Sequence, residues 1–248
     1  TKLESAYQEP ITLLSNLFVN PSPVTFLVMN ESDHDWWVEQ VKSLNSNQDL
    51  GWWNGSHCSV SVFVHCGYGS TPNPDGSFHF GQLLGSKFEW NTQDYVSAYH
   101  ESIHVYQLGL MGNRMSFLPN WFAEGQANYL GATFVNRFRS TESVRGGEIR
   151  NLLNKLPELK NYKKQDWVTF LEKIDSDSNY VFQIGLGYSI GMLLLEDIYN
   201  KFGYEAIQNW MLNIKSGNSY KEAFEQVFKI KYQEWLTGSA AEYLSRQL

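Results

Sequence analysis

The spacing of apolar residues restricts the fold of this chain more than any other feature. From about residue 92 to the C-terminus, apolar residues recur every three or four positions, which places them on one side of an α-helix. Before that point, residues 24–29 (VTFLVM) form a strand-like run after a Pro-containing turn, and residues 59–64 (SVSVFV) show strict β-branched alternation. We therefore expect an α+β fold, in which a small β-containing N-terminal lobe precedes a mainly helical lobe.

The turn residues divide this pattern into elements. A turn-rich loop at 67–77 precedes a strand-like run at 78–84, and residues 139–147 (RSTESVRGG) have the composition of an internal hinge. The expected helices are 92–108, 119–137, 147–155, 166–174, 182–202, 204–215, 219–228 and 231–246.

The size of the chain fits one domain. Its 248 residues and 42% hydrophobic content suffice for one large core or two closely packed lobes. We expect a single domain, 1–248, with approximate lobes 1–115 and 116–248. The oligomeric state is left open.

Charge and hydropathy exclude two kinds of partner. A net charge of −7, with scattered lysines and arginines, argues against a nucleic-acid surface. No apolar stretch approaches the roughly 20 residues of a membrane helix, so we expect no membrane span. The chain begins at Thr1 without a methionine or a targeting segment, and we expect a processed, exported protein, secreted or periplasmic.

The motif H-E-x-x-H, formed by His100, Glu101 and His104, lies in the first of the expected helices. On a helix, positions i and i+4 face the same side, so both imidazoles could bind one Zn²⁺ ion. Glu101, beside the first of them, could accept a proton from an attacking water molecule. Gly109 or Gly112 can end this helix. The alternative is a pair of surface or core histidines without a metal.

A catalytic zinc site needs a third protein ligand. One common continuation of the motif requires Gly and His where this chain has Gln107 and Leu110, so it does not apply. The other requires a glutamate on a second helix. Glu124, within the segment PNWFAEGQANY, meets that requirement and shares a helix face with Trp121 and Asn128.

These residues resemble the gluzincin metallopeptidases, the peptidase MA-like superfamily of thermolysin-type enzymes. The matching positions are His100, Glu101 and His104, followed after 19 intervening residues by Glu124 in W-F-A-E-G-Q-A. The resemblance implies that His100, His104 and Glu124 hold one zinc ion and that Glu101 is the catalytic base. It also implies a zincin-like helical lobe and an active-site cleft between the two lobes.

The chain departs from the family pattern at two positions. Where thermolysin-type enzymes have an aspartate that supports a ligand histidine, this chain has Asn128, which brings no charge. No histidine follows His104, so a tyrosine must stabilise the oxyanion if any side chain does so. By family likeness the best candidate is Tyr188 in G-Y-S-I-G, and a packed core tyrosine is an equally good interpretation of that residue.

The resulting hypothesis is a zinc-dependent metallopeptidase, expected to be an endopeptidase, that hydrolyses peptide or protein substrates. The run at 78–84 is the expected place for a substrate to pair as an added strand. One alternative is a zinc-binding, peptidase-like module with a binding or regulatory role and little activity. A second is an aromatic-rich glycan-binding domain, based on the pairs at 36–37 and 52–53.

Overall fold

The computed structural model describes residues 2–17, 24–30, 34–43, 65–72, 78–84, 92–136 and 140–248. By its internal contacts the chain divides into two compact units. Unit 1 is Thr1–Gly109 and unit 2 is Leu110–Leu248. Each unit is described below by itself.

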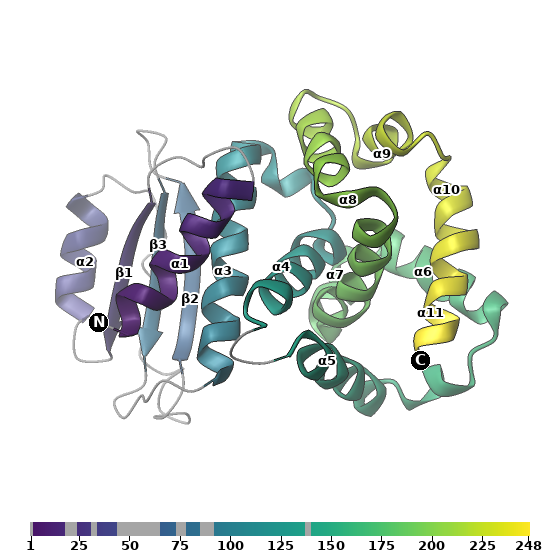
Figure 1. Cartoon of the computed structure of the whole chain (residues 1–248), viewed down its shortest axis with the longest axis horizontal. Coiled ribbons are helices and arrows are strands. Elements are labelled where there is room, and N and C mark those ends of the chain that lie inside the picture. The colour runs from purple at the N-terminus through teal and green to yellow at the C-terminus, as the bar shows by residue number, and fades with distance from the viewer. Residues whose placement is uncertain are drawn as a thin grey trace. The chain divides into compact units, whose positions relative to one another are not determined.

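Unit 1 contains a three-stranded sheet with helices before, between and after its strands (Figure 1). Its elements are α1 (Lys2–Leu17), β1 (Val24–Asn30), α2 (His34–Ser43), β2 (His65–Pro72), β3 (Phe78–Leu84) and α3 (Thr92–Met111), whose last turn enters unit 2. The strand order is β1-β3-β2, and α2 lies next to β1.

The strand β3 lies in the middle of this sheet. It pairs in parallel with β1, from Val24 opposite Phe78 to Asn30 opposite Leu84. On its other side it pairs antiparallel with β2. The strands expected at 24–29 and 78–84 are therefore present, and the segment at 59–64 lies outside the described residues. The hypothesis that 78–84 binds substrate as an added strand is wrong, because both sides of β3 already have partners.

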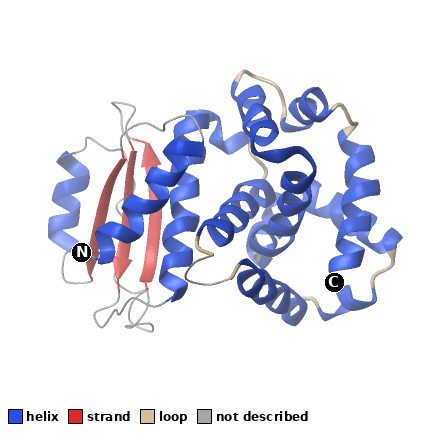
Figure 2. Cartoon of the chain, in the orientation of Figure 1, coloured by secondary structure: helices blue, strands red, loops and turns tan. Residues whose placement is uncertain are grey.

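The structure also corrects the predicted fold class, because the chain is mainly helical (Figure 2). In residues 92–136 and 140–248 no strand is present. In unit 1, α1 and α2 occupy segments of the N-terminal lobe for which no helix was expected. The predicted α+β class is therefore wrong, because the three short strands are a minor part of the described fold.

Unit 2 consists of helices joined by short turns (Figure 1). They are η4 (Gly112–Phe117), α4 (Asn120–Phe134), α5 (Thr141–Lys155), η5 (Pro157–Asn161), α6 (Lys164–Ser176), α7 (Ser178–Ile184), η6 (Gly187–Gly191), α8 (Met192–Lys215), α9 (Tyr220–Phe228), α10 (Tyr232–Glu234), η7 (Trp235–Ala240) and α11 (Ala241–Gln247). The segments η6 and η7 are π-helical.

Three helix boundaries in unit 2 depend on single residues. The helix expected over 182–202 is interrupted at Gly185, whose φ of 70° ends α7. The break expected near 203 is present within α8, where Gly203 has a φ of 77°. The hinge expected at 139–147 is wrong: Ser140 caps α5 by accepting a hydrogen bond from the Ser143 amide at 3.2 Å.

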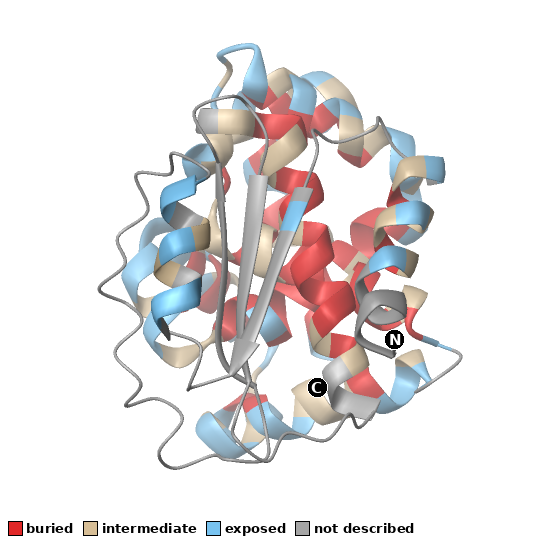
Figure 3. Cartoon of the chain, turned by 90° about the vertical axis from the view of Figure 1, so that its left-hand side faces the viewer, coloured by how far each residue is buried: buried red, intermediate tan, exposed pale blue. Residues whose placement is uncertain are grey.

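An aromatic cluster forms part of the core of unit 2. Trp121 of α4 lies against Trp210 of α8 and Trp235 of η7, with ring centroids 6.3 and 6.1 Å apart, respectively. Phe224 of α9 packs against both Trp210 and Trp235. The described helices have both buried and exposed residues (Figure 3), as amphipathic helices that cover a core do.

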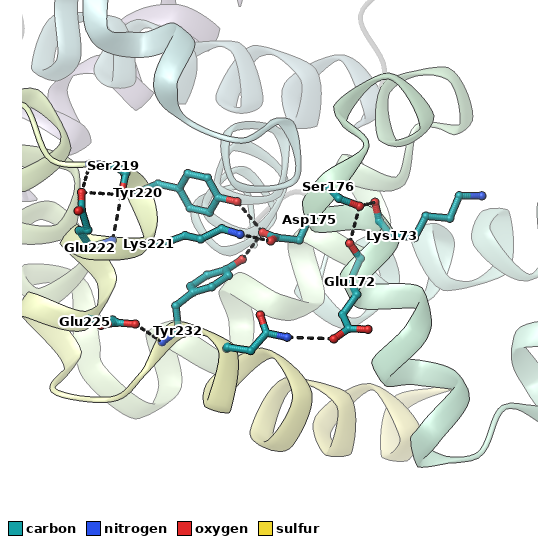
Figure 4. Close-up of polar contacts among 11 residues, drawn as sticks. Glu172, Lys173, Asp175, Ser176, Ser219, Tyr220, Lys221, Glu222, Glu225 and Tyr232 are labelled. Carbon is teal, nitrogen blue, oxygen red and sulfur yellow. Dashed lines mark hydrogen bonds and ion pairs between the residues drawn. The ribbon is translucent and has the colours of Figure 1, made fainter.

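A buried carboxylate connects three helices near this cluster (Figure 4). Asp175 of α6 accepts hydrogen bonds from the hydroxyls of Tyr220 in α9 and Tyr232 in α10, each at 2.6 Å. Lys221 donates to the other oxygen of Asp175 at 2.6 Å. The Asp175 side chain is only 7% exposed, so these donors replace the water that its charge would otherwise need.

In the described part of the chain, no single helix has both the length and the apolar composition to cross a membrane. The segments Ser178–Ile184 and Gly187–Lys215 meet those criteria only when taken together, as a pair bent by 97°.

Candidate metal centre

The helix α3 holds the H-E-x-x-H motif in place through its buried side. Val96, Tyr99, Ile103 and Tyr106 are each at most 5% exposed and recur at helical spacing. Gly112, with a φ of 58°, follows the last residue of α3 and lets the chain leave the helix. The predicted helix and its glycine end are therefore confirmed.

The two histidines of the motif face one another. The Nε2 atoms of His100 and His104 are 3.1 Å apart, and their rings meet edge to face at an interplanar angle of 82°. Two imidazole nitrogens bound to one tetrahedral zinc ion, each at about 2.0–2.1 Å, lie about 3.3 Å apart. The observed separation therefore fits two ligands of a single ion without a change of rotamer.

Glu101 lies beside the histidine pair. Its Oε1 atom is 3.7 Å from His100 Nε2, and one ligand atom from each of His100, Glu101 and His104 falls within a 4.8 Å group. Both His100 and Glu101 are 5% exposed. The Glu101 carboxylate lies beside the two imidazoles and not between them. It can therefore exchange a proton with a water molecule that lies near both histidines.

Gln107, one turn after His104, fixes the orientation of that histidine. Its Oε1 atom lies 2.8 Å from His104 Nδ1, and the Gln107 side chain is fully buried. Since an amide oxygen only accepts, His104 donates from Nδ1, and in a neutral imidazole this leaves Nε2 without a proton. That is the tautomer a metal ligand needs, and the sequence analysis did not assign this role to Gln107.

Glu124 is fixed by the packing of α4 within unit 2. Trp121 and Phe122, one turn before it, are at most 1% exposed and lie in the aromatic cluster. Pro119, the first residue of the helix expected over 119–137, is instead the N-cap of α4 and has an extended backbone. The Glu124 side chain is half-buried, and its Oε2 atom is inaccessible to solvent.

Glycines bring α4 and η6 to backbone contact. A Cβ atom at Gly125 would lie 2.3 Å from the carbonyl carbon of Gly191, and one at Gly191 would lie 2.1 Å from the carbonyl oxygen of Trp121. A Cβ atom at Gly187 would lie 2.8 Å from the Cβ of Glu124. No other residue type fits these three positions, so the G-Y-S-I-G segment lies directly against the helix that contains Glu124.

Asn128 connects the same two elements by a hydrogen bond. Its Nδ2 atom donates to the backbone carbonyl of Tyr188 at 2.8 Å. A carbonyl only accepts, so the nitrogen of the amide must face it and the Oδ1 atom must face the other way. An aspartate could not make this bond, which gives a physical reason for the asparagine at this position.

Tyr188 is not a packed core residue. Its side chain is 36% exposed, and it lines a cavity of about 380 Å³ formed by α5 and the segment from Ile184 to Ser189. The π-helical turn that contains it begins at Gly187, two residues after the left-handed Gly185 that ends the preceding helix. Irregular helical turns of this kind are frequent at functional sites.

The predicted site residues thus fall into two groups. In unit 1 the structure brings together His100, Glu101 and His104, and in unit 2 it brings together Glu124, Asn128 and Tyr188. The residues that sequence reasoning missed are Gln107 and the glycines of η6. The i, i+3 spacing from His104 was the available signal for Gln107, and the paired small residues were the signal for the glycines.

Comparisons with protein-family models, with curated proteins and with solved structures found no match to this chain.

Proposed function

We propose that the chain is a zinc-dependent metallopeptidase of the gluzincin type that cleaves peptide or protein substrates internally. The observation that supports this proposal best is the 3.1 Å separation of the His100 and His104 Nε2 atoms, with Glu101 beside them. This separation is close to that of two imidazole nitrogens bound to one tetrahedral zinc ion. Glu124 is the proposed third ligand.

The proposed roles follow from the chemistry of these side chains. When bound, zinc would polarise the substrate carbonyl and make water more acidic. Glu101 accepts the proton of the attacking water and returns it to the leaving amine, which restores the carboxylate for the next cycle. Gln107 keeps the proton of His104 on Nδ1.

Unit 2 supplies the remaining proposed roles. Tyr188, which is partly exposed, donates a hydrogen bond to the oxygen that becomes negative in the transition state. The Asn128 amide holds the backbone of that tyrosine by donating to its carbonyl oxygen. The glycine contacts keep η6 against α4, so that Tyr188 and Glu124 share one rigid support.

The first test compares the zinc-loaded chain with Glu101→Gln on a library of unstructured peptides, with cuts identified by mass spectrometry. We expect internal cuts in the wild type and a loss of about 10²–10⁴-fold in rate in the variant, with bound zinc unchanged. Glu142→Gln is the matched control, because Glu142 is exposed on α5 and belongs to neither group of site residues.

Zinc content distinguishes the remaining possibilities. Glu124→Gln and His100→Ala should both reduce bound zinc, as measured by elemental analysis after dialysis. Zinc retained in both variants would contradict the proposed ligands. Stoichiometric zinc with no cleavage in the wild type would instead favour the alternative, a zinc-binding module with a regulatory role.

A further inference from the structure

The two units of the chain differ in their charge. Acidic residues are spread evenly, with 11 in Thr1–Gly109 and 15 in Leu110–Leu248. Basic residues are not, because unit 1 has three lysines and no arginine, whereas unit 2 has 16 lysines and arginines. With histidine neutral, the formal net charge is therefore −8 for unit 1 and +1 for unit 2. The negative charge of the chain comes from unit 1 alone.

The carboxylates of unit 2 have cations of the same unit beside them. For example, Arg145 pairs with Glu196 at 2.8 Å, and Lys221 pairs with Asp175 at 2.6 Å. Unit 1 cannot balance its charge in this way, because three lysines can compensate only three of its 11 acids. The excess negative charge therefore acts on molecules that approach unit 1 in solution.

The helices α1 and α2 show the same imbalance on described parts of unit 1. In α2, Asp35 lies in the first turn and Glu39 follows one turn later, and both are exposed. Lys42 is the one basic residue of that helix, since its histidine is counted as neutral. The helix α1 has two glutamates and one lysine. Each of these helices therefore adds to the negative charge of the unit.

The H-E-x-x-H motif belongs to this acidic unit, since His100, Glu101 and His104 all precede Gly109. A compact unit of this length has a radius of gyration of about 13 Å. Charges interact over about 30 Å at 10 mM ionic strength and over about 8 Å at 0.15 M. At low ionic strength every charge of unit 1 therefore contributes to the potential at the motif. A bound zinc ion would offset only two of the eight excess negative charges.

We propose that the substrates are basic peptides, rich in lysine and arginine, which the negative potential of unit 1 attracts to the H-E-x-x-H motif. The cleavage that follows rests on the proposed function, whereas the attraction needs only the charge of unit 1. Fields of this kind raise association rates by about 10–10³-fold, and salt weakens them by screening. The same field repels an acidic peptide, so the sign of the peptide's charge decides how fast it associates.

Association without turnover tests the attraction. The full chain contains Glu101→Gln, with zinc in the buffer, so that no peptide is cut during the measurement. The probes are three dansyl-labelled peptides of equal length, with four lysines, four serines or four glutamates at the same positions, followed by stopped-flow fluorescence. At 10 mM ionic strength we expect the lysine peptide to associate about tenfold faster than the serine peptide, and the glutamate peptide to be the slowest. At 500 mM the differences should fall below about twofold.

Matched charge reversals assign the effect to unit 1. The double variant Asp35→Lys with Glu39→Lys raises the charge of unit 1 by four, and Glu142→Lys with Glu205→Lys does the same in unit 2. Asp35 and Glu142 both lie in the first turn of a helix, and all four acids are exposed. We expect the unit 1 variant to reduce the advantage of the lysine peptide by about threefold, and the unit 2 variant to reduce it less.

Three results would each overturn the proposal: equal rates for the three peptides at 10 mM, rates that do not depend on salt, or equal effects of the two double variants. Turnover of the same peptides by the wild-type chain is scored separately. If none is cut while the lysine peptide keeps its advantage in association, the peptidase proposal fails and the attraction of basic peptides stands.

Discussion

Gln107 acts on the histidine pair through a single hydrogen bond to His104 Nδ1. Leucine at this position fills a similar volume but accepts no hydrogen bond, so His104 would lose its fixed tautomer. We expect Gln107→Leu to weaken zinc binding by about 10–100-fold, as measured by competition with a chromophoric chelator.

Gln126 provides a control for that substitution. It is also buried, but its amide donates to the hydroxyl of Tyr199 at 2.7 Å and takes no part in the proposed centre. Gln126→Leu should lower stability and leave zinc affinity unchanged. If both leucine variants weakened zinc binding equally, the loss would reflect general destabilisation and Gln107 would have no orienting role.

Asn128 gives a second prediction at the scale of one residue. Asn128→Asp would match the family pattern, yet it removes the donor to the Tyr188 carbonyl and places a carboxylate against that oxygen. We expect the free energy of unfolding to fall by about 1–3 kcal/mol in urea titrations, with no gain in peptide cleavage. In the control, Asn136→Asp, the Asn136 side chain accepts from the Thr141 amide, a role that aspartate can also fill. A stable, more active Asn128→Asp variant would contradict this account.

At the scale of elements, the backbone contact between α4 and η6 gives a test of the glycines. Gly125→Ala introduces a Cβ atom where the backbone of Gly191 lies, and a backbone cannot rotate away as a side chain can. We expect a loss of about 1–3 kcal/mol in the free energy of unfolding, and a weaker contact between η6 and α4. Gly238→Ala in η7 is the control, because a Cβ atom there meets nothing within 4 Å. Equal stabilities of the two variants would refute the close approach.

The helices that hold the two groups of site residues could be predicted, because the sequence contains both their apolar spacing and the residues at their ends. α3 has its apolar side and its terminal Gly112, and α4 has Pro119 before its first turn. The two strands β1 and β3 were also expected, from the strand-like runs at 24–29 and 78–84. In these cases local spacing and tertiary packing agree.

Other elements could not be predicted, for identifiable physical reasons. α1 contains Pro10, which lacks an amide donor and ordinarily ends a helix, so packing overrides the local signal. The apolar spacing runs continuously through 182–202, and only the left-handed backbone of Gly185 shows that the helix is broken there. The π-helical turn of η6 depends on its contact with α4, so no local sequence pattern predicts the turn.

At the scale of the whole molecule, unit 2 contains several tyrosines whose ionisation opposes the folded state. Burial and the neighbouring Asp175 raise the pKa of Tyr220 and Tyr232 well above their usual value near 10. Burial and the hydrogen bond to Glu196 do the same for Tyr243. In the unfolded chain these hydroxyls ionise near pH 10, while in the folded chain they stay protonated.

The pH dependence of stability follows from this difference. The folded state binds more protons than the unfolded state above pH 10, so stability is fully present below that pH and falls as the pH rises. Above pH 10, each of these tyrosines lowers the free energy of unfolding by about 1.4 kcal/mol for each pH unit. We expect urea midpoints measured from pH 9 to 11 to decrease, and to decrease less steeply in Tyr220→Phe. An identical slope in the variant would contradict the prediction.

The aromatic cluster of unit 2 also has a spectroscopic consequence. Trp121, Trp210 and Trp235 are each at most 2% exposed. The ring centroid of Trp121 is 6.3 Å from that of Trp210 and 6.1 Å from that of Trp235, and the planes of Trp121 and Trp235 differ by 28°. Indoles at such separations share their excited states, so their ultraviolet absorption bands couple and produce a strong circular-dichroism signal in the aromatic region. Because the coupling vanishes when the rings separate, loss of the circular-dichroism signal in the aromatic region would show that unit 2 has unfolded, without an added label.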